Sequence, residues 1–356
     1  MTTQHILPTG QTACYSENGE LVDCRNTAQD AAQLLPGYCA GWSADRYQVL
    51  NDHLVLDRAT ELIWMRDGCP SQYPLSWSEA LQFVAQLNNE ARYGRDDWRL
   101  PNRRELRSLI DHSRRKPALP AGHPFLNIFL GWYWTSTTAA IAPRYAWYLH
   151  LEGGRMFYGN KDGYYWFWPV CGKSAILAGT GAIHCYDTGG SQIPCAKSGQ
   201  DAADKQGAVW PSPRFMKEND DVIIDRLTGL SWQTTALHGE PRTSWQAALN
   251  AVIGLAETTG AAWRMPTINE LESLVDASAH SPALIENHPF LELQSAYWSS
   301  TTSGFEPDWA YVLYLEKGAV GVGYKKNRDF ALWPVKSSAA LPQVSADPAE
   351  NQQRRG

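Results

Sequence analysis

The chain has 356 residues, including 16 Trp and 16 Tyr; only 19% of its residues are charged, and its net charge is −6. This length suits two domains that each bury a core, and the aromatic content is typical of β-rich proteins. The acidic balance argues against a general nucleic-acid binder, which is usually basic. No apolar run approaches the ~20 residues of a membrane span.

The sequence is an internal duplication with a period near 165 residues. Trp98–Pro101 recurs as Trp263–Pro266, and Trp168–Val170 recurs as Trp333–Val335. This period is the size of a whole domain rather than of a solenoid unit of roughly 20–50 residues. We therefore predict domains at 1–173 and 174–337, each including an N-terminal cysteine hairpin, and a disordered tail at 338–356, which is small, polar and proline-bearing.

Each repeat opens with two cysteines that flank a turn, Cys14 with Cys24 and Cys185 with Cys195. This spacing predicts two disulfide-closed hairpins, each worth about 2–3 kcal/mol, and an oxidising compartment. Four reduced thiols in a cytosolic protein are the alternative. The N-terminal stretch lacks the pattern of a signal peptide, so we expect a mature secreted chain, extracellular or on the cell surface, whose leader is absent from this sequence.

Three further cysteines, Cys39, Cys69 and Cys171, all fall in the first repeat. We predict a disulfide between Cys69 and Cys171, which would tie the middle of the domain to its end. Because three thiols cannot all pair within one chain, Cys39 is expected to stay free or to link to a partner chain.

After each hairpin and its connector, a strand is predicted at 57–64 or 225–232, followed by two helices. Apolar residues at helical spacing predict the first helix over 77–87 and 245–255. The second helix begins directly after a proline in both repeats. The predicted capping pairs are Ser76 with Glu79, Thr243 with Gln246, Asn102 with Glu105, and Thr267 with Glu270.

Beyond the helices the apolar period changes to two, which predicts antiparallel strands at 133–137, 146–151, 155–158 and 166–170. Each repeat is therefore expected to be an α+β domain. The pairs Arg99 with Glu105 and Arg264 with Glu270 are interpreted as structural ion pairs at helix starts. Three tryptophans are interpreted as core residues. These are Trp64, Trp98 and Trp134.

Five segments, 57–64, 77–80, 98–106, 134–138 and 168–170, resemble the Lcl C-terminal domain family, which is named for the end domain of a bacterial collagen-like adhesin. The stretch 9–30 is similar to an extension in tandem members. The resemblance implies two tandem C-type-lectin-like domains, each of two helices plus an antiparallel sheet, and a bacterial, extracellular setting. For the named adhesin it implies binding of sulfated glycosaminoglycans; for most members it implies no assigned activity.

Differences between the repeats indicate a candidate ligand face in the first. The alternation along 146–151 and 155–158 places one set of side chains in the core and a second, largely aromatic set outward. An outward aromatic cluster with an arginine suits stacking on sugar rings or burial in a protein interface; contact with the second domain or the connector is the alternative. The candidate residues are Tyr148, His150, Arg155, Phe157, Tyr164, Tyr165 and Trp166.

A second candidate is a basic cluster on and after the second helix of the first repeat. Arg103 and Arg107 are one turn apart, so we expect them to share a face suited to a sulfate- or phosphate-bearing chain. A solvated helix surface is the alternative. The candidate residues are Arg103, Arg104, Arg107, Arg114 and Arg115, and the second repeat has Ile268, Asn269 and Glu272 at the first three positions.

The sequence shows no serine–histidine–acid pattern, metal-ligand spacing or phosphate loop, so we expect no enzyme activity, no metal and no cofactor. We expect an adhesin-like recognition protein in which the first repeat binds and the second is a spacer. The expected partner is a glycan, a polyanionic polysaccharide or a host or neighbouring protein, and not a nucleic acid. The alternative is a structural subunit that self-associates head-to-tail into a fibre or surface layer.

Overall fold

The computed structural model describes residues 6–33, 42–43, 45–236 and 242–338. The elements up to the end of the first repeat are β1 (Cys14–Tyr15), β2 (Leu21–Val22), β3 (Tyr47–Val49), β4 (Leu54–Asp57), β5 (Leu62–Met65), α1 (Trp77–Asn89), α2 (Arg103–Arg107), β6 (Trp132–Thr138), β7 (Tyr145–His150), β8 (Met156–Asn160) and β9 (Val170–Cys171). The second repeat follows with β10 (Cys185–Tyr186), β11 (Gln192–Ile193), α3 (Asp201–Asp204), β12 (Phe215–Lys217), β13 (Val222–Asp225), β14 (Leu230–Gln233), α4 (Trp245–Thr259), α5 (Ile268–Ser273), β15 (Ala296–Thr302), β16 (Trp309–Tyr314), β17 (Ala319–Tyr324) and β18 (Val335–Ser337). The α+β prediction is confirmed in both repeats.

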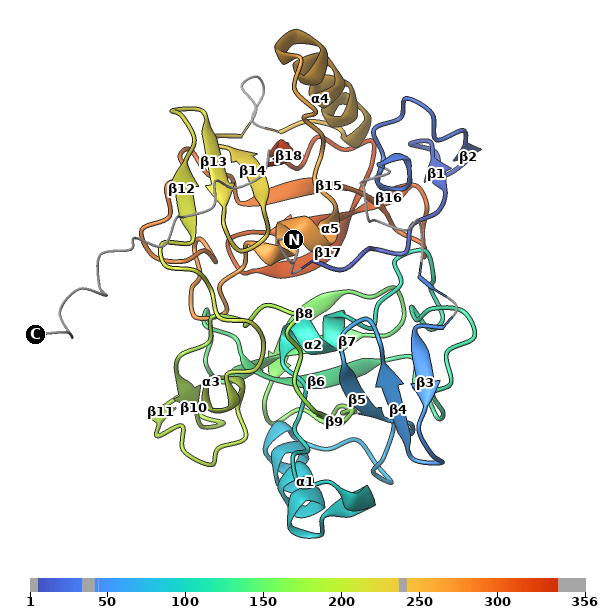
Figure 1. The fold of residues 1–356 in the computed structure, drawn as a ribbon, viewed down its shortest axis with the longest axis vertical. Helices are drawn as coiled ribbons and strands as arrows, with labels where there is room; N and C mark the ends of the chain where they lie inside the picture. The colour runs from blue at the N-terminus through green and yellow to red at the C-terminus, as the bar shows by residue number, and fades with distance from the viewer. Residues whose placement is uncertain (1–5, 34–41, 44, 237–241, 339–356) are drawn as a thin grey trace, which may run out of the picture.

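The two repeats share one six-stranded antiparallel sheet, in the order β15-β16-β17-β8-β7-β6. The seam between them is the β17–β8 edge, where Val320 pairs with Met156. Helix α2 packs on β6 and β7, and α5 packs on β15 and β16. Figure 1 shows α2 and α5 near the middle of the molecule, with α1 and α4 at its opposite ends. The strand order makes the two halves equivalent about the seam.

Each repeat adds a four-stranded sheet, β3-β4-β5-β9 in the first and β12-β13-β14-β18 in the second. The prediction of a fourth meander strand at 166–170 is wrong in extent. Trp166 forms only an isolated bridge with Tyr133, and β9 pairs instead with β5. Pro169 lies between these two pairings. Because proline has no backbone N–H, it cannot donate the hydrogen bond that would continue one strand through 166–170.

Side-chain capping starts the longer helices where the sequence predicts it, with one exception. Ser76 and Asn102 cap α1 and α2 in complete capping boxes, and Thr267 caps α5 in the same way. The exception is α4, whose N-cap is Ser244 and not Thr243. Ser244 is the counterpart of Ser76, 168 residues on, so the duplication was the better guide to this start.

Both disulfides predicted from the cysteine spacing, Cys14–Cys24 and Cys185–Cys195, are present. The hairpins that they close cross over between the repeats. The first hairpin lies within the predicted domain 1–173, yet it packs on the second repeat, and the second hairpin packs on the first. Gly19 at the first turn lies against Asp308, and Gly190 at the second turn lies against Arg144.

Each hairpin and the short helix that follows it, together called the hairpin segment, are held on the opposite repeat by buried polar contacts. Asp30 accepts a 2.5 Å hydrogen bond from Thr301, and Asp201 accepts one of 2.7 Å from Thr137. Burial raises the pKa of both Asp30 and Asp201 to about 6. The buried amine of Lys161 donates to the main-chain oxygens of Tyr186 and Asp187 at 3.1 and 3.2 Å.

One hydrophobic core runs through both repeats and includes Leu106 and Met156 of the first with Leu271 and Val320 of the second. The core assignment of the three tryptophans is confirmed, since none is more than 2% exposed. The structural ion pairs are confirmed as well: Arg99 lies 2.5 Å from Glu105 and Arg264 2.5 Å from Glu270. The two repeats are therefore packed as one unit.

The predicted Cys69–Cys171 disulfide is wrong. Both cysteines are free, and their thiols meet different groups: Cys69 lies 3.2 Å from the Tyr133 hydroxyl, and Cys171 lies 3.5 Å from the carbonyl oxygen of Ile63. Cys39 lies outside the described residues, as does nearly all of the predicted tail. Within the described part of the chain, no helix has the length and apolarity needed to span a membrane.

Candidate binding site

The outward aromatic residues predicted in the first repeat gather on one face of the six-stranded sheet. Leu149 and Met156 are fully buried, whereas their neighbours Tyr148, His150 and Phe157 are half-exposed. Tyr148 and Phe157 are directly opposite each other on β7 and β8. The predicted alternation along these strands is therefore confirmed.

The rings of this face contact one another. Ring centroids lie 4.1 Å apart for Trp132 and Tyr148, 4.6 Å for Trp132 and His150, and 5.0 Å for Tyr148 and Tyr165. Gly159 makes room for Tyr148, because a Cβ added at this glycine would lie 2.1 Å from the tyrosine ring. The sequence prediction missed Trp132, although its counterpart Ala296 marks the same difference between the repeats.

The remaining predicted aromatics border this cluster. Trp166 packs against Phe129, with centroids 5.7 Å apart, and Phe129 is itself 50% exposed. Tyr164 is 67% exposed, and Arg155 is also exposed. We call the whole set the aromatic face. It consists of Phe129, Trp132, Tyr148, His150, Phe157, Tyr164, Tyr165 and Trp166.

The second repeat lacks this concentration of rings. Register and the isolated bridges place Ala296 at the position of Trp132, Val312 at that of Tyr148, and Ala331 at that of Trp166. Val312 is fully buried, within a cluster that also holds Trp245 of α4. The aromatic face is therefore a property of the first repeat on this side of the sheet.

Burial accounts for the electrostatics of the aromatic face. It raises the pKa of Tyr148 to about 12 and lowers the pKa of His150. Both groups are therefore neutral at neutral pH, and His150 Nδ1 lies 2.8 Å from the carbonyl oxygen of Glu152. A surface of uncharged rings with hydroxyl groups at their edges can stack on an apolar face of a ligand and hydrogen-bond to its rim.

The basic cluster, by contrast, is largely not available to a ligand. Arg103 and Arg107 are 2% and 6% exposed, and both form ion pairs with the buried Glu272 of the second repeat, at 3.2 and 2.8 Å. Arg103 also donates to the carbonyl oxygen of Gly318, and Arg107 to that of Gly154. Both arginines lie in the contact between the repeats, so the expectation of an accessible polyanion site on them is wrong.

The other three arginines of the cluster are divided. Arg104 donates to the main-chain oxygens of Ser273 and Val275 at 3.1 and 2.8 Å, so it too joins the two repeats. Arg114 and Arg115 are exposed, and Arg114 lies 3.9 Å from Asp111. The five residues are therefore not brought together on one accessible surface.

A family model described as the Lcl C-terminal domain matches residues 53–171 and 221–336. The chain belongs to this family. No curated protein matches the chain, and no solved structure matches it. The two matched segments contain the helices α1, α2, α4 and α5 and the whole six-stranded sheet. Both disulfide hairpins lie outside the matched segments, so the crossover is added to the two Lcl C-terminal domains.

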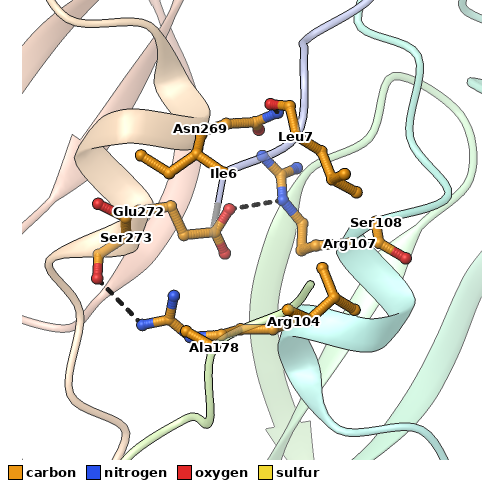
Figure 2. Close-up of a pocket in the computed structure, with 10 residues that line it drawn as sticks. Ile6, Leu7, Arg104, Arg107, Ser108, Ala178, Asn269, Glu272 and Ser273 are labelled. Carbon is orange, nitrogen blue, oxygen red and sulfur yellow. Dashed lines mark hydrogen bonds and ion pairs between the residues drawn. The ribbon is translucent and has the colours of Figure 1, made fainter. Parts of the chain in front are cut away.

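The contact between the two Lcl C-terminal domains contains a small, partly open cavity of about 60 Å³. Figure 2 shows Arg107 directed toward Glu272, with Arg104 reaching Ser273 across the same space. A water molecule needs roughly 10–15 Å³ measured this way, so the cavity has room for a few waters and not for a sugar. It is part of the domain contact rather than a ligand site.

A larger open groove of about 750 Å³ lies beside the connector, between residues 179–183, 205–210 and 276–286. Trp210 lines this groove, and its indole N–H donates a 2.8 Å hydrogen bond to the carbonyl oxygen of Gly179. Across the described residues, no group of three or more His, Cys, Asp or Glu side chains could hold a metal ion. The aromatic face remains the strongest candidate site.

Proposed function

We propose that the chain is a non-enzymatic recognition protein of the bacterial exterior, with C-type-lectin-like domains, that binds a glycan through the aromatic face of its first Lcl C-terminal domain. The observation that carries the proposal is the cluster of half-exposed rings around Trp132 and Tyr148, which the second domain replaces with Ala296 and Val312. Flat, uncharged, partly solvated rings suit the apolar faces of pyranose sugars and their hydroxyl rims.

An exterior location is supported by the two disulfides, which persist in oxidising compartments and are rare in the cytosol. Recognition without catalysis is supported by the chemistry of the aromatic face, which offers stacking surfaces and phenol hydroxyls rather than paired acids or an activated nucleophile. A sulfated ligand loses support because Arg103 and Arg107 are committed to Glu272.

The alternative of a head-to-tail structural subunit also loses support. That hypothesis requires the first repeat of one chain to contact the second repeat of its neighbour. Here the unlike repeats meet within one chain, through Glu272 and the seam between β17 and β8.

The test is binding of the purified, non-reduced protein to a broad glycan array, with Trp132→Ala as the site variant. A stacking ring at a binding hot spot contributes about 2 kcal/mol or more, so the affinity should fall at least about 30-fold. Trp309→Ala is the matched control, because Trp309 is a half-exposed strand tryptophan of the second domain that packs on Tyr324 rather than on the aromatic face. It should leave the affinity unchanged.

An array with no hit for the wild-type protein would overturn the glycan proposal, as would equal losses in both tryptophan variants. If the array shows no binding and light scattering shows particles that grow with protein concentration, the structural-subunit hypothesis is favoured instead.

A further inference from the structure

We propose that the ligand is an extended, uncharged polysaccharide chain that crosses the seam, so that the second Lcl C-terminal domain supplies part of the site through Tyr314. This rests on the proposed function, since it concerns the same aromatic face. It changes the role of the second domain from a spacer to a contributor of contacts.

Aromatic side chains occupy a row that runs across the strands rather than along one of them. Trp132 of β6 packs on Tyr148 of β7 with ring centroids 4.1 Å apart, and Tyr148 pairs with Phe157 of β8. Beyond the seam, Ala319 of β17 pairs with Tyr314 of β16. Because Val320 pairs with Met156 across the antiparallel seam, Ala319 stands opposite Phe157. Residues opposite each other on neighbouring strands project from the same face of a sheet, so Tyr314 and Phe157 face the same way.

Gly321 is the residue that lets the row continue over the seam. A Cβ added there would lie 3.3 Å from Cζ of Phe157 and 2.8 Å from Cε2 of Tyr314. The rings of the two domains therefore converge on this glycine, one from each side. Both rings remain half-exposed, so together they form a surface that belongs to neither domain alone.

The row is long enough for an oligomer rather than a single sugar. It reaches from β6 through β7, β8 and β17 to β16, and neighbouring strands lie about 4.8 Å apart, so it spans about 19 Å. A ligand confined to the first domain would contact only the part on β6, β7 and β8.

The side chains around the row indicate that the bound polysaccharide is uncharged. The row itself contains no Lys, Arg, Asp or Glu side chain. At its border, the exposed Arg155 is accompanied by Glu152, which pairs with Lys116 at 2.7 Å. Three arginines of the predicted polyanion site instead bind Glu272 and main-chain oxygens within the domain contact; these are Arg103, Arg104 and Arg107.

The experiment measures binding of two probe series to the full chain by calorimetry: β-1,4-linked glucose oligomers and β-1,4-linked N-acetylglucosamine oligomers, from dimer to hexamer. Heparin is the charged comparison. We expect one uncharged hexamer to bind at least about 10-fold more tightly than its dimer, with little change between low and physiological salt.

Tyr314→Ala should lower the affinity for the hexamer about 10-fold and leave the dimer unchanged. Tyr314→Leu keeps most of the apolar bulk without the ring and should show the same length-dependent loss in a protein that melts like the wild type. The matched control is Tyr324→Ala, because Tyr324 is three positions from Gly321 on β17 and therefore faces the other side of the sheet. It should leave both affinities unchanged.

If the hexamer binds and Trp132→Ala weakens it but neither Tyr314 variant does, the seam-crossing inference is wrong while the proposed function stands. Binding of heparin with a steep salt dependence and no binding of the uncharged oligomers would overturn the uncharged ligand. Equal loss of dimer and hexamer binding in Tyr314→Leu would overturn the seam-crossing inference.

Discussion

The carboxylate of Glu272 allows a direct test of how the two Lcl C-terminal domains are held together. It is 7% exposed and lies 2.8 Å from Arg107 and 3.2 Å from Arg103. Although burial alone would raise its pKa, the charges of Arg107 and Arg103 hold the pKa of Glu272 below its usual range. Glu272→Gln removes the negative charge and leaves two buried guanidinium groups, and breaking a buried ion pair in this way costs about 3–5 kcal/mol.

The assay is urea unfolding followed by tryptophan fluorescence. With a slope of about 3 kcal/mol per molar urea, this cost lowers the unfolding midpoint by about 1–1.7 M. The control Glu218→Gln changes an exposed glutamate after β12 and should shift the free energy of unfolding by less than about 0.5 kcal/mol. A loss below about 1 kcal/mol for Glu272→Gln would refute the reasoning, and two separate transitions in the wild type would contradict a shared core.

Two further predictions concern the hairpin segments. Because the pKa of Asp201 rises from 3.8 in the unfolded chain to about 6 on burial, its protonation stabilises the fold below pH 3.8, and this contribution is lost as pH rises through 6. The free energy of unfolding of the wild type minus that of Asp201→Asn should therefore fall by up to about 3 kcal/mol between pH 4 and pH 7; parallel pH profiles would exclude this. Replacing both Cys185 and Cys195 with Ser should cost about 2–3 kcal/mol and increase hydrogen exchange in β6, which the second hairpin segment contacts through Thr137; unchanged exchange there would contradict the crossover.

Local patterns predicted most of the secondary structure because they act over a few residues. Asn102 and Thr267 start helices where their side chains can cap the first turn, and the alternation of Tyr148 with Leu149 separates the outer face from the core. Most of the candidate aromatic face followed from the same alternation. Trp132 was missed because it stands one position outside the predicted strand, which begins a residue earlier than expected.

The arginines show why a comparison of the two repeats could not identify a ligand site by itself. A difference between duplicated domains arises either from a ligand that one domain binds or from the contact of one domain with the other. Arg107 and Glu272 occupy equivalent positions, 165 residues apart, and pair across the approximate two-fold arrangement. Their opposite charges are what such a contact requires, but the sequence alone does not distinguish this from ligand binding.

The sequence by itself determined the duplication, the α+β class, most helix starts, the two hairpin disulfides and most of the outward aromatic set, because spacing, capping and alternation each report on neighbours along the chain. Only the tertiary structure decided that the hairpins exchange repeats, that β17 and β8 join the sheets, and that Arg103 and Arg107 are buried. These features depend on contacts between segments more than 100 residues apart, such as Asp30 with Thr301 and Arg103 with Glu272. Such pairings follow from complementary surfaces and leave no periodic signal in the chain.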